Sequence, residues 1–261
     1  MANPAAAREL LVFGRELERD SAAQAGGGFT GSSDADALLH SSANAFLLGV
    51  LFTQGVPAER AWSGPYRLLG RLGTLDLQVL ASEPERVREA FQRPPMLHRF
   101  KETLPAWITR AAARLLREYS GDAAAIWPPG AHVLEVTRRL AEFDGIGRKK
   151  AVMAVELLIR HFGVPLEGRE CGSVAYDVHV RRVFLRTGIV DVDTPEAISA
   201  AAAEACPESP GTLDLATWLV GRDWCRPRAP LCDECRLAAS CMRRTGITPV
   251  GVGSRSNARD S

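Results

Sequence analysis

Four closely spaced cysteines near the end of the chain are the residues whose spacing most clearly indicates chemistry. In "WCRPRAPLCDECRLAASCMRR" they are Cys225, Cys232, Cys235 and Cys241, with six, two and five residues between successive ones. Four thiolates so spaced can enclose one metal site, and soft sulfur ligands favour zinc or an iron–sulfur cluster. Zinc ribbons usually pair two short C-x2-4-C arms, and only one such arm is present. The spacing thus differs from a zinc ribbon, and at this point zinc and an iron–sulfur cluster both stay open as the metal group.

A glycine turn followed by three cations is the second feature with chemical potential. The stretch "AEFDGIGRKKAVMAVELL" places Gly145, Ile146 and Gly147 directly before Arg148, Lys149 and Lys150. Glycines let a backbone approach an anion closely, and the N–H groups of a turn and of a helix N-terminus bind phosphate. Cations at a helix N-terminus oppose the helix dipole and cost stability unless an anion meets them. The stretch therefore predicts a phosphate-binding hairpin between two helices.

The elements that must position these residues are helices throughout. Apolar residues recur at helical spacing in almost every segment, and Asp177 stands where the N-cap of a helix "VHVRRVFLRTG" belongs. Ser82 is expected to cap a helix that has Pro84 in its first turn, and residues 23–36 are expected to form a flexible break. With no convincing strand, the predicted class is all-α, with the other helices at about 6–19, 44–54, 58–71, 97–119, 131–143, 194–206 and 211–223.

Bulk properties restrict the function classes only loosely. The 261 residues carry a net charge of +1, so any surface that binds nucleic acid must be local. No apolar run approaches the roughly 20 residues that span a bilayer, and the charged N-terminus lacks the core of a signal peptide. We therefore expect a cytosolic protein that does not bind membranes.

Together these motifs resemble one known family. "FDGIGRKKA", "AYDVHVRRV" and the C-x6-C-x2-C-x5-C order are similar to the hairpin, the catalytic aspartate segment and the cluster loop of the endonuclease III branch of the helix-hairpin-helix DNA glycosylases. The resemblance runs from about residue 44 to 244. It implies two lobes and a [4Fe-4S] cluster on Cys225, Cys232, Cys235 and Cys241. The implied segments are 44–160 as a helical barrel, 161–245 as the cluster lobe with the helix of 1–43, and 246–261 as a disordered tail.

The resemblance also assigns roles to individual residues. Lys149, the second residue after the hairpin, matches the nucleophile of lyase-competent members, and Asp177 matches the catalytic aspartate. Gln54 matches a glutamine that fills the gap left by an extruded base. The hairpin residues Gly145, Ile146, Gly147, Arg148 and Lys150 are expected to contact DNA, with Lys150 in a surface or backbone role.

The implied activity is base-excision repair by a monomer acting on duplex DNA that contains damaged bases or abasic sites in the nucleoid. A glycosylase with β-elimination lyase activity on oxidised pyrimidines is the first interpretation. A monofunctional glycosylase for mismatched, deaminated or alkylated bases and a non-catalytic protein that recognises DNA structure are the alternatives. Asp144, which replaces a common proline, and the long interval from Lys149 to Asp177, containing "EGRECGS" and Cys171, depart from the family pattern.

Overall fold

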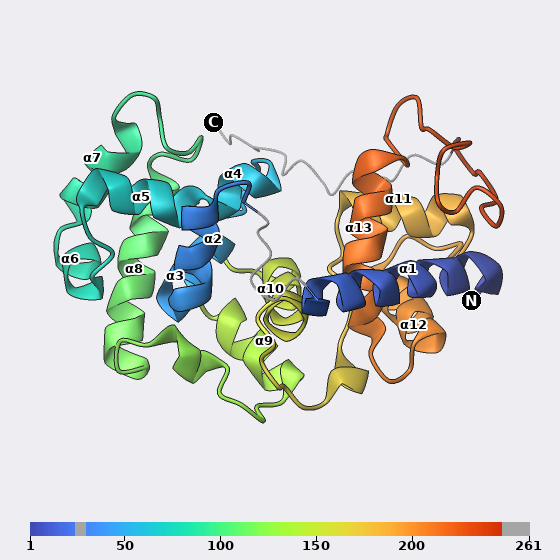
Figure 1. Cartoon of the computed structure of the whole chain (residues 1–261), viewed down its shortest axis with the longest axis horizontal. Helices are drawn as coiled ribbons and strands as arrows, with labels where there is room; N and C mark the ends of the chain where they lie inside the picture. The colour runs from blue at the N-terminus through green and yellow to red at the C-terminus, as the bar shows by residue number, and fades with distance from the viewer. Residues whose placement is uncertain (24–29, 247–261) are drawn as a thin grey trace, which may run out of the picture.

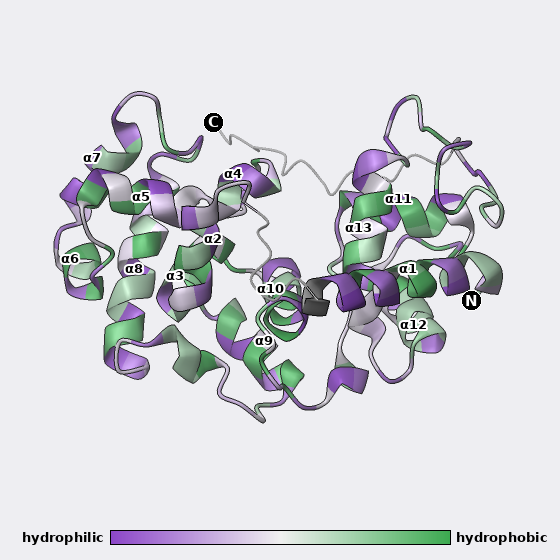
Figure 2. Cartoon of the chain, viewed as in Figure 1, coloured by the Kyte–Doolittle hydropathy of each residue, from purple (hydrophilic) through white to green (hydrophobic). Residues whose placement is uncertain are grey.

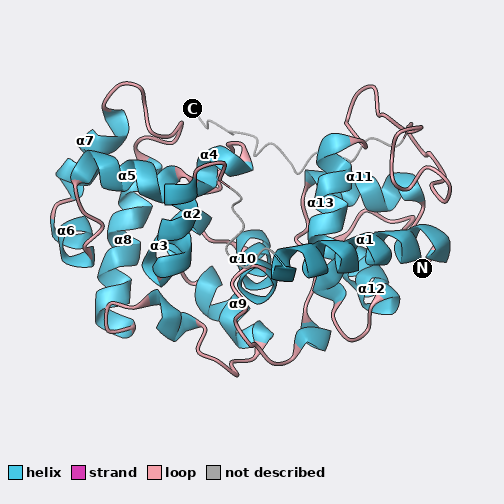
Figure 3. Ribbon diagram, in the orientation of Figure 1, coloured by secondary structure: helices cyan, strands magenta, loops and turns pink. Residues whose placement is uncertain are grey.

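Every regular element of the described chain is helical. The computed structural model describes residues 1–23 and 30–246. Within these ranges the only pairing of extended backbone is an isolated parallel bridge between His132 and Glu167, and Figure 3 shows helices joined by loops. The predicted all-α class is therefore confirmed.

The larger lobe is a barrel of helices around α3. This helix, Ala43–Phe52, is buried from Ala45 to Phe52 because its sequence has no polar face. Phe46, Phe52 and Phe91 are among the largest fully buried side chains of this core. The surrounding helices are α2 (Ser33–Ser41), α4 (Ala58–Trp62), α5 (Gly64–Leu72), α6 (Leu77–Ser82), α7 (Pro84–Gln92), α8 (Thr103–Glu118), α9 (Val133–Ala141) and α10 (Arg148–Arg160).

The smaller lobe combines the first helix with the last three. α1 (Pro4–Ala23) lies beside α12 (Pro195–Ala205) and α13 (Leu213–Asp223), and α11 (Val178–Thr187) packs on α13. A second apolar core holds these helices together, with Leu10, Phe184 and Val220 among its buried members. Figure 2 colours hydrophobic stretches, in green, on helices of both lobes. The chain thus crosses from the small lobe to the barrel and back, and α10 leads into the segment that returns.

Three expected helix boundaries are wrong, and one of them is the start of the helix expected over 97–119, since α8 begins at Thr103. The helix expected over 58–71 is divided into α4 and α5 because Pro65 occupies the first turn of α5, and Gly64 packs so tightly on Phe52 that a Cβ would lie 2.3 Å from its ring. Ser82 does not cap the following helix. It is the last residue of α6, where its hydroxyl donates to the carbonyl of Gln78 at 2.7 Å, while Pro84 does begin α7 as expected.

The expected flexible break is shorter than predicted. Residues 33–36 already belong to α2, whose N-cap Ser32 accepts a hydrogen bond from the backbone N–H of Ala35. Burial of Ala35 and Leu39 against the barrel supplies the stabilisation that a composition argument overlooked. Residues 24–29 of the break and the expected tail from 247 lie outside the described residues.

No single described helix has the length and apolar character needed to cross a membrane. α2 and α3 meet that criterion only as a pair bent by 118°, by length and composition alone.

Candidate active site and cluster loop

The glycine turn joins α9 to α10 and requires one of its two glycines. Gly145 has a φ of +83°, and a Cβ there would lie 2.4 Å from the ring of Trp107. Any other residue would therefore be strained twice, by backbone conformation and by contact. Gly147 has a φ of −83° and open space around it, so nothing in the described chain demands glycine there. A need for glycine at 147 must come from a ligand that approaches from outside.

Ile146 lies between these glycines and faces inward. Its side chain is 2% exposed in the barrel core, and its N–H donates to the carbonyl of Phe143 at 2.9 Å. The expected contact of Ile146 with DNA therefore cannot involve its side chain. Ile146 instead stabilises the turn by packing its side chain in the barrel core.

Lys149 and Asp177 come together from two helix N-termini. Their Nζ and Oδ2 atoms are 3.4 Å apart, although 28 positions separate the residues in sequence. Asp177 is the N-cap of α11, and its Oδ1 accepts hydrogen bonds from the N–H groups of His179 and Val180 at 2.8 and 2.9 Å. These two bonds fix the orientation of the carboxylate and leave Oδ2 for Lys149. The lysine side chain is 53% exposed and the aspartate only 8%, so the amine is the accessible member of the pair.

Lys150 departs from the expected surface role. It is 7% exposed, its ammonium donates to the carbonyl of Leu51 at 3.0 Å, and it lies 5.8 Å from the centre of the Trp107 ring. Burial, followed by the positive charge of Lys149, lowers the pKa of Lys150 to about 8. Because its side chain points into the barrel, Lys150 does not contact DNA in this conformation. It instead connects the hairpin to the end of α3.

Gln54 follows that same end of α3 in a half-buried turn. The next residue, Gly55, accepts a weak hydrogen bond from Nη1 of Arg99 at 3.4 Å. Lys150 therefore holds the turn on one side through Leu51, and Arg99 contacts it on the other. The role expected for Gln54, to fill the gap that an extruded base leaves in the duplex, stays a prediction.

Asp144 and Arg148 lie on the exposed side of the hairpin. Asp144 forms an ion pair with Arg110 of α8 at 2.5 Å, so its negative charge is balanced within the protein. This pairing explains how an acid is tolerated beside the expected phosphate site. Arg148 is exposed at the first position of α10, where it remains available to an anion.

A buried ionic network supports the segment that carries Asp177, and sequence reasoning missed it. Asp214 of α13 accepts a hydrogen bond from the N–H of Ala175 at 2.6 Å and lies 3.8 Å from Arg160. Arg160 also lies 3.9 Å from Glu156, one turn earlier on α10. Burial raises the pKa of Asp214, and Arg160 opposes that rise. Arg160 is shared between the two acids as an ion-pair partner, and its charge does not offset the effect of burial on either pKa.

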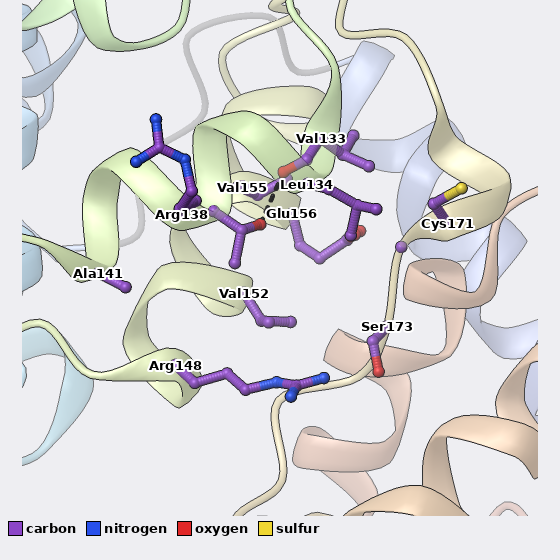
Figure 4. Close-up of a pocket in the computed structure, with 12 residues that line it drawn as sticks. Val133, Leu134, Arg138, Ala141, Arg148, Val152, Val155, Glu156, Cys171 and Ser173 are labelled. Carbon is purple, nitrogen blue, oxygen red and sulfur yellow. Dashed lines mark hydrogen bonds between the residues drawn. The ribbon is translucent and has the colours of Figure 1, made fainter.

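Glu156 is the most perturbed member of this network. Its side chain is 4% exposed, its Oε2 has no hydrogen-bond partner among the described residues, and burial raises its pKa to about 7. It lies in a hollow of about 400 Å³ between α9, α10 and residues 171–173. Figure 4 shows Glu156 within this hollow and Arg148 reaching from the start of α10 towards Ser173. The spacing of Glu156 and Arg160 on a helix was the available sequence signal, but burial was not visible in it.

Cys171 lies at the exposed end of the same segment, near two other groups able to bind metals. The ligating atoms of His132, Glu170 and Cys171 all lie within 4.8 Å of one another. Nδ1 of His132, however, already accepts the N–H of Leu134 at 3.3 Å and caps α9. We assign no metal site here, and Cys171 remains a loop cysteine.

The four C-terminal cysteines line one small cavity. Their thiols are free, and Thr187, Val220, Trp224 and Leu237 complete its walls. Backbone N–H groups of Leu237 and Arg243 point at the sulfur atoms of Cys235 and Cys241, at 3.5 and 3.3 Å. The guanidinium of Arg186 lies 3.9 Å from the sulfur of Cys225. Soft ligands with N–H donors and a nearby cation fit an anionic iron–sulfur cluster.

Sequence comparisons relate the chain to endonucleases III. It is 32% identical to endonuclease III of Thermotoga maritima over 120 residues, which cover 45% of this chain and 52% of that protein. It is 31% identical to endonuclease III of Rickettsia conorii over 106 residues, or 40% and 45% of the two chains. The matched regions thus span about half the length of these curated relatives. No protein-family model matches the chain.

Solved structures extend the similarity to most of the fold. A trapped covalent intermediate of endonuclease III with DNA has a TM-score of 0.58 at 20% identity, covering 78% of this chain and 84% of that one. The chain is therefore similar to endonucleases III in sequence over part of its length and in overall fold. A thermostable thymine-DNA glycosylase covers 92% of this endonuclease III-like chain, with a TM-score of 0.62 at 11% identity. At these identities the likeness establishes the fold alone.

Proposed function

We propose that this endonuclease III-like protein is a base-excision repair DNA glycosylase with an associated β-elimination lyase activity. We further propose oxidised pyrimidines in duplex DNA as its substrate class and the nucleoid of the cytoplasm as its place of action. The observation that carries the proposal is the 3.4 Å approach of Lys149 Nζ to Asp177 Oδ2. An exposed amine beside an oriented carboxylate is the arrangement that such chemistry requires.

The reaction needs the damaged nucleotide outside the helix stack. Extrusion of a base costs a few kcal/mol and is least costly for a poorly paired one. The turn at Gly145–Gly147 and the exposed Arg148 support binding of the phosphate backbone near the extruded nucleotide, since Gly147 leaves open space in front of the N-terminus of α10. Gln54 is proposed to occupy the vacated place in the duplex.

Chemistry then proceeds at C1′ of the extruded nucleotide. The neutral amine of Lys149 forms a bond to C1′, while the bond from C1′ to the base breaks and its electron pair leaves with the base. The carboxylate of Asp177 stabilises the positive charge that develops on the sugar. Opening of the sugar ring gives a Schiff base with Lys149, and loss of a C2′ proton then expels the 3′ phosphate.

Asp177 also offers a place for the proton that the nitrogen of Lys149 loses once its bond to C1′ has formed. Its Oδ2 is the atom nearest the amine, and Oδ1 is held by two backbone N–H groups. The buried Asp214 supports this arrangement indirectly, because it holds the N–H of Ala175 two residues before Asp177. Positioning by the backbone lets the carboxylate act without reorganising during the reaction.

We propose that Cys225, Cys232, Cys235 and Cys241 hold a [4Fe-4S] cluster. When bound, such a cluster cross-links the four thiolates and fixes the loop between Cys225 and Cys241. Arg186 supports that loop as well, because its guanidinium donates to the carbonyl of Arg226 at 2.7 Å. The loop lies at the end of α13, so it is proposed to meet the phosphate backbone together with the hairpin.

A panel of duplexes, each with one defined lesion, tests the proposed activity. The holoprotein is expected to release an oxidised pyrimidine, and Asp177→Asn is expected to lower that release by about 100-fold or more while retaining affinity for the duplex. A protein that recognises DNA structure without catalysis would release no base from any duplex in the panel. Release of only mismatched or alkylated bases would overturn the proposed substrate class and leave the glycosylase in place.

A further inference from the structure

Most arginines of the barrel lobe are paired with acids. Arg86 and Arg88 of α7 contact Glu83 and Glu85, and Arg138 of α9 contacts Glu135. Arg114 of α8 likewise contacts both Glu118 and Glu142. The two charges of each pair cancel almost completely. These faces therefore present little net charge to a molecule one Debye length away.

One region of the same lobe departs from this pattern. Arg60 of α4, Arg67 and Arg71 of α5, and Arg99 before α8 form no ion pair with any acid of residues 1–23 and 30–246. The neighbouring acids are engaged elsewhere. Glu59 pairs with Arg222 of the small lobe at 3.7 Å, and Asp34 accepts the hydroxyl of Tyr66.

Backbone carbonyl groups, in place of acids, accept hydrogen bonds from Arg60, Arg71 and Arg99. Arg71 donates to the carbonyls of Ala90 and Arg93 at 2.7 and 2.8 Å, and also to that of Pro95. Arg60 donates to the carbonyl of Met96 at 3.5 Å. Neutral carbonyls orient a guanidinium without cancelling its charge. The arginines are thus placed by the fold while their positive field is kept.

These cations are also close enough to affect one another. The pKa of Arg67 is lowered, first by burial and then by the charges of Arg60 and Arg71. Burial lowers the pKa of His98 as well, and the charges of Lys150, Arg60 and Arg99 add to that effect. Arg67 and Arg71 are four residues apart on α5, a spacing at which like charges destabilise a helix. The fold therefore retains a repulsion that an external anion would relieve.

The position of this group relates it to the candidate active site. The four arginines without an acidic partner, Arg60, Arg67, Arg71 and Arg99, are here called the strip. It begins at Arg99, which contacts Gly55 next to Gln54, and continues through Arg60 and Arg67 to Arg71. The ion pair from Glu59 to Arg222 places α4 opposite the end of α13. Figure 1 shows α4 and α5 in the upper part of the barrel lobe, below α7 and the loop after it, and the cysteine loop at the upper right of the small lobe. The strip therefore starts beside the turn that contains Gln54 and leads away from it over the barrel lobe.

We propose that Arg60, Arg67, Arg71 and Arg99 form a second DNA-binding surface, which contacts the phosphate backbone of the duplex on the barrel side of the extruded nucleotide. The partner is identified by its regular series of phosphates. Guanidinium groups that have no acidic partner bind phosphate strongly and often bidentately. The proposal rests on the proposed function for the presence of an extruded nucleotide. Binding of an undamaged duplex, however, requires only the strip.

The test compares two double variants that remove the same formal charge from the same lobe. Arg60→Ala with Arg67→Ala removes two unpaired arginines, and Arg86→Ala with Arg88→Ala removes two that are paired with acids. Affinity for an undamaged duplex is measured on the holoproteins by fluorescence anisotropy over a series of salt concentrations. Each lost phosphate contact lowers the slope of log affinity against log salt by about 1.

The strip variant is expected to lower the slope by about 2 and the paired variant by less than about 0.5. Equal slopes for the wild type and both variants would overturn the proposal, as would equal losses in both variants. Circular dichroism confirms that each variant is folded, and Arg60→Lys with Arg67→Lys is expected to recover most of the slope. The wild type could release no damaged base from any duplex while the salt dependence of affinity decreases in the strip variant alone. In that case the glycosylase proposal fails and the proposed DNA-binding surface stands.

Discussion

Replacing Glu156 with glutamine should stabilise the protein at neutral and alkaline pH but not in acid. Burial raises the pKa of this carboxyl from 4.5 to about 7, and the groups that face it are Arg160, Asp214, Arg169 and Glu18. One pKa unit corresponds to about 1.4 kcal/mol. Above pH 7 the shift therefore lowers the free energy of unfolding by about 3 kcal/mol relative to a group that stays neutral.

The direction of this change in stability with pH follows from proton binding to Glu156. Between pH 4.5 and 7 the folded protein holds a proton on Glu156 that the unfolded chain has released, so stability falls as pH rises through this window. Glutamine does not titrate and keeps the neutral form at every pH. The stability advantage of Glu156→Gln over the wild type should therefore increase by about 2 kcal/mol from pH 5 to pH 8.

Urea denaturation at several pH values, followed by circular dichroism, measures this difference. Comparing the pH dependence of the two proteins removes any constant effect of the substitution on packing. Glu170→Gln is the matched control, because Glu170 is exposed in the neighbouring segment and should give a curve parallel to the wild type. Parallel curves for Glu156→Gln as well would refute the reasoning, since the carboxyl would then titrate alike in both states.

Three further predictions follow from the hairpin, the N-cap and the cysteine loop. Gly145→Ala should lower the free energy of unfolding by about 2 kcal/mol or more, through its φ of +83° and its contact with Trp107, whereas Gly147→Ala should leave urea denaturation unchanged. Asp177→Ala should cost about 1 kcal/mol by removing the N-cap of α11, and Asp177→Asn should cost little, so a large thermal shift for Asn alone would contradict the capping role. Cys232→Ser should lower the iron content of anaerobically purified protein and its absorbance near 400 nm; zinc in a colourless wild type would reject the iron–sulfur assignment.

Short motifs, through their resemblance to the family, indicated the two residues that meet at the candidate site. The N-cap position of Asp177 and the position of Lys149 after a glycine turn each depend on only a few neighbouring residues. The structure places Nζ of Lys149 3.4 Å from Oδ2 of Asp177. The spacing of the cysteines is equally local, and their thiols line one cavity. Features fixed within one or two turns of chain could thus be read from the sequence.

Features that depend on packing between helices could not be predicted in this way. A surface or backbone role was expected for Lys150, yet Lys150, Ala154 and Leu158 share the buried face of α10. Asp214 meets the segment before Asp177 only through the packing of α13 on that segment, which no single stretch of sequence encodes.

Covalent trapping on an abasic site tests the central claim most directly. Lys149 is the only hairpin lysine placed to form a Schiff base, because Lys150 is buried and donates to Leu51. Incubation of the holoprotein with abasic duplex and borohydride should yield a stable protein–DNA adduct, and peptide mapping should place the modification on Lys149. Lys149→Ala should abolish the adduct while retaining duplex binding, and Lys150→Ala should retain it. No adduct with the wild type, or an undiminished adduct with Lys149→Ala, would contradict the proposed role of Lys149.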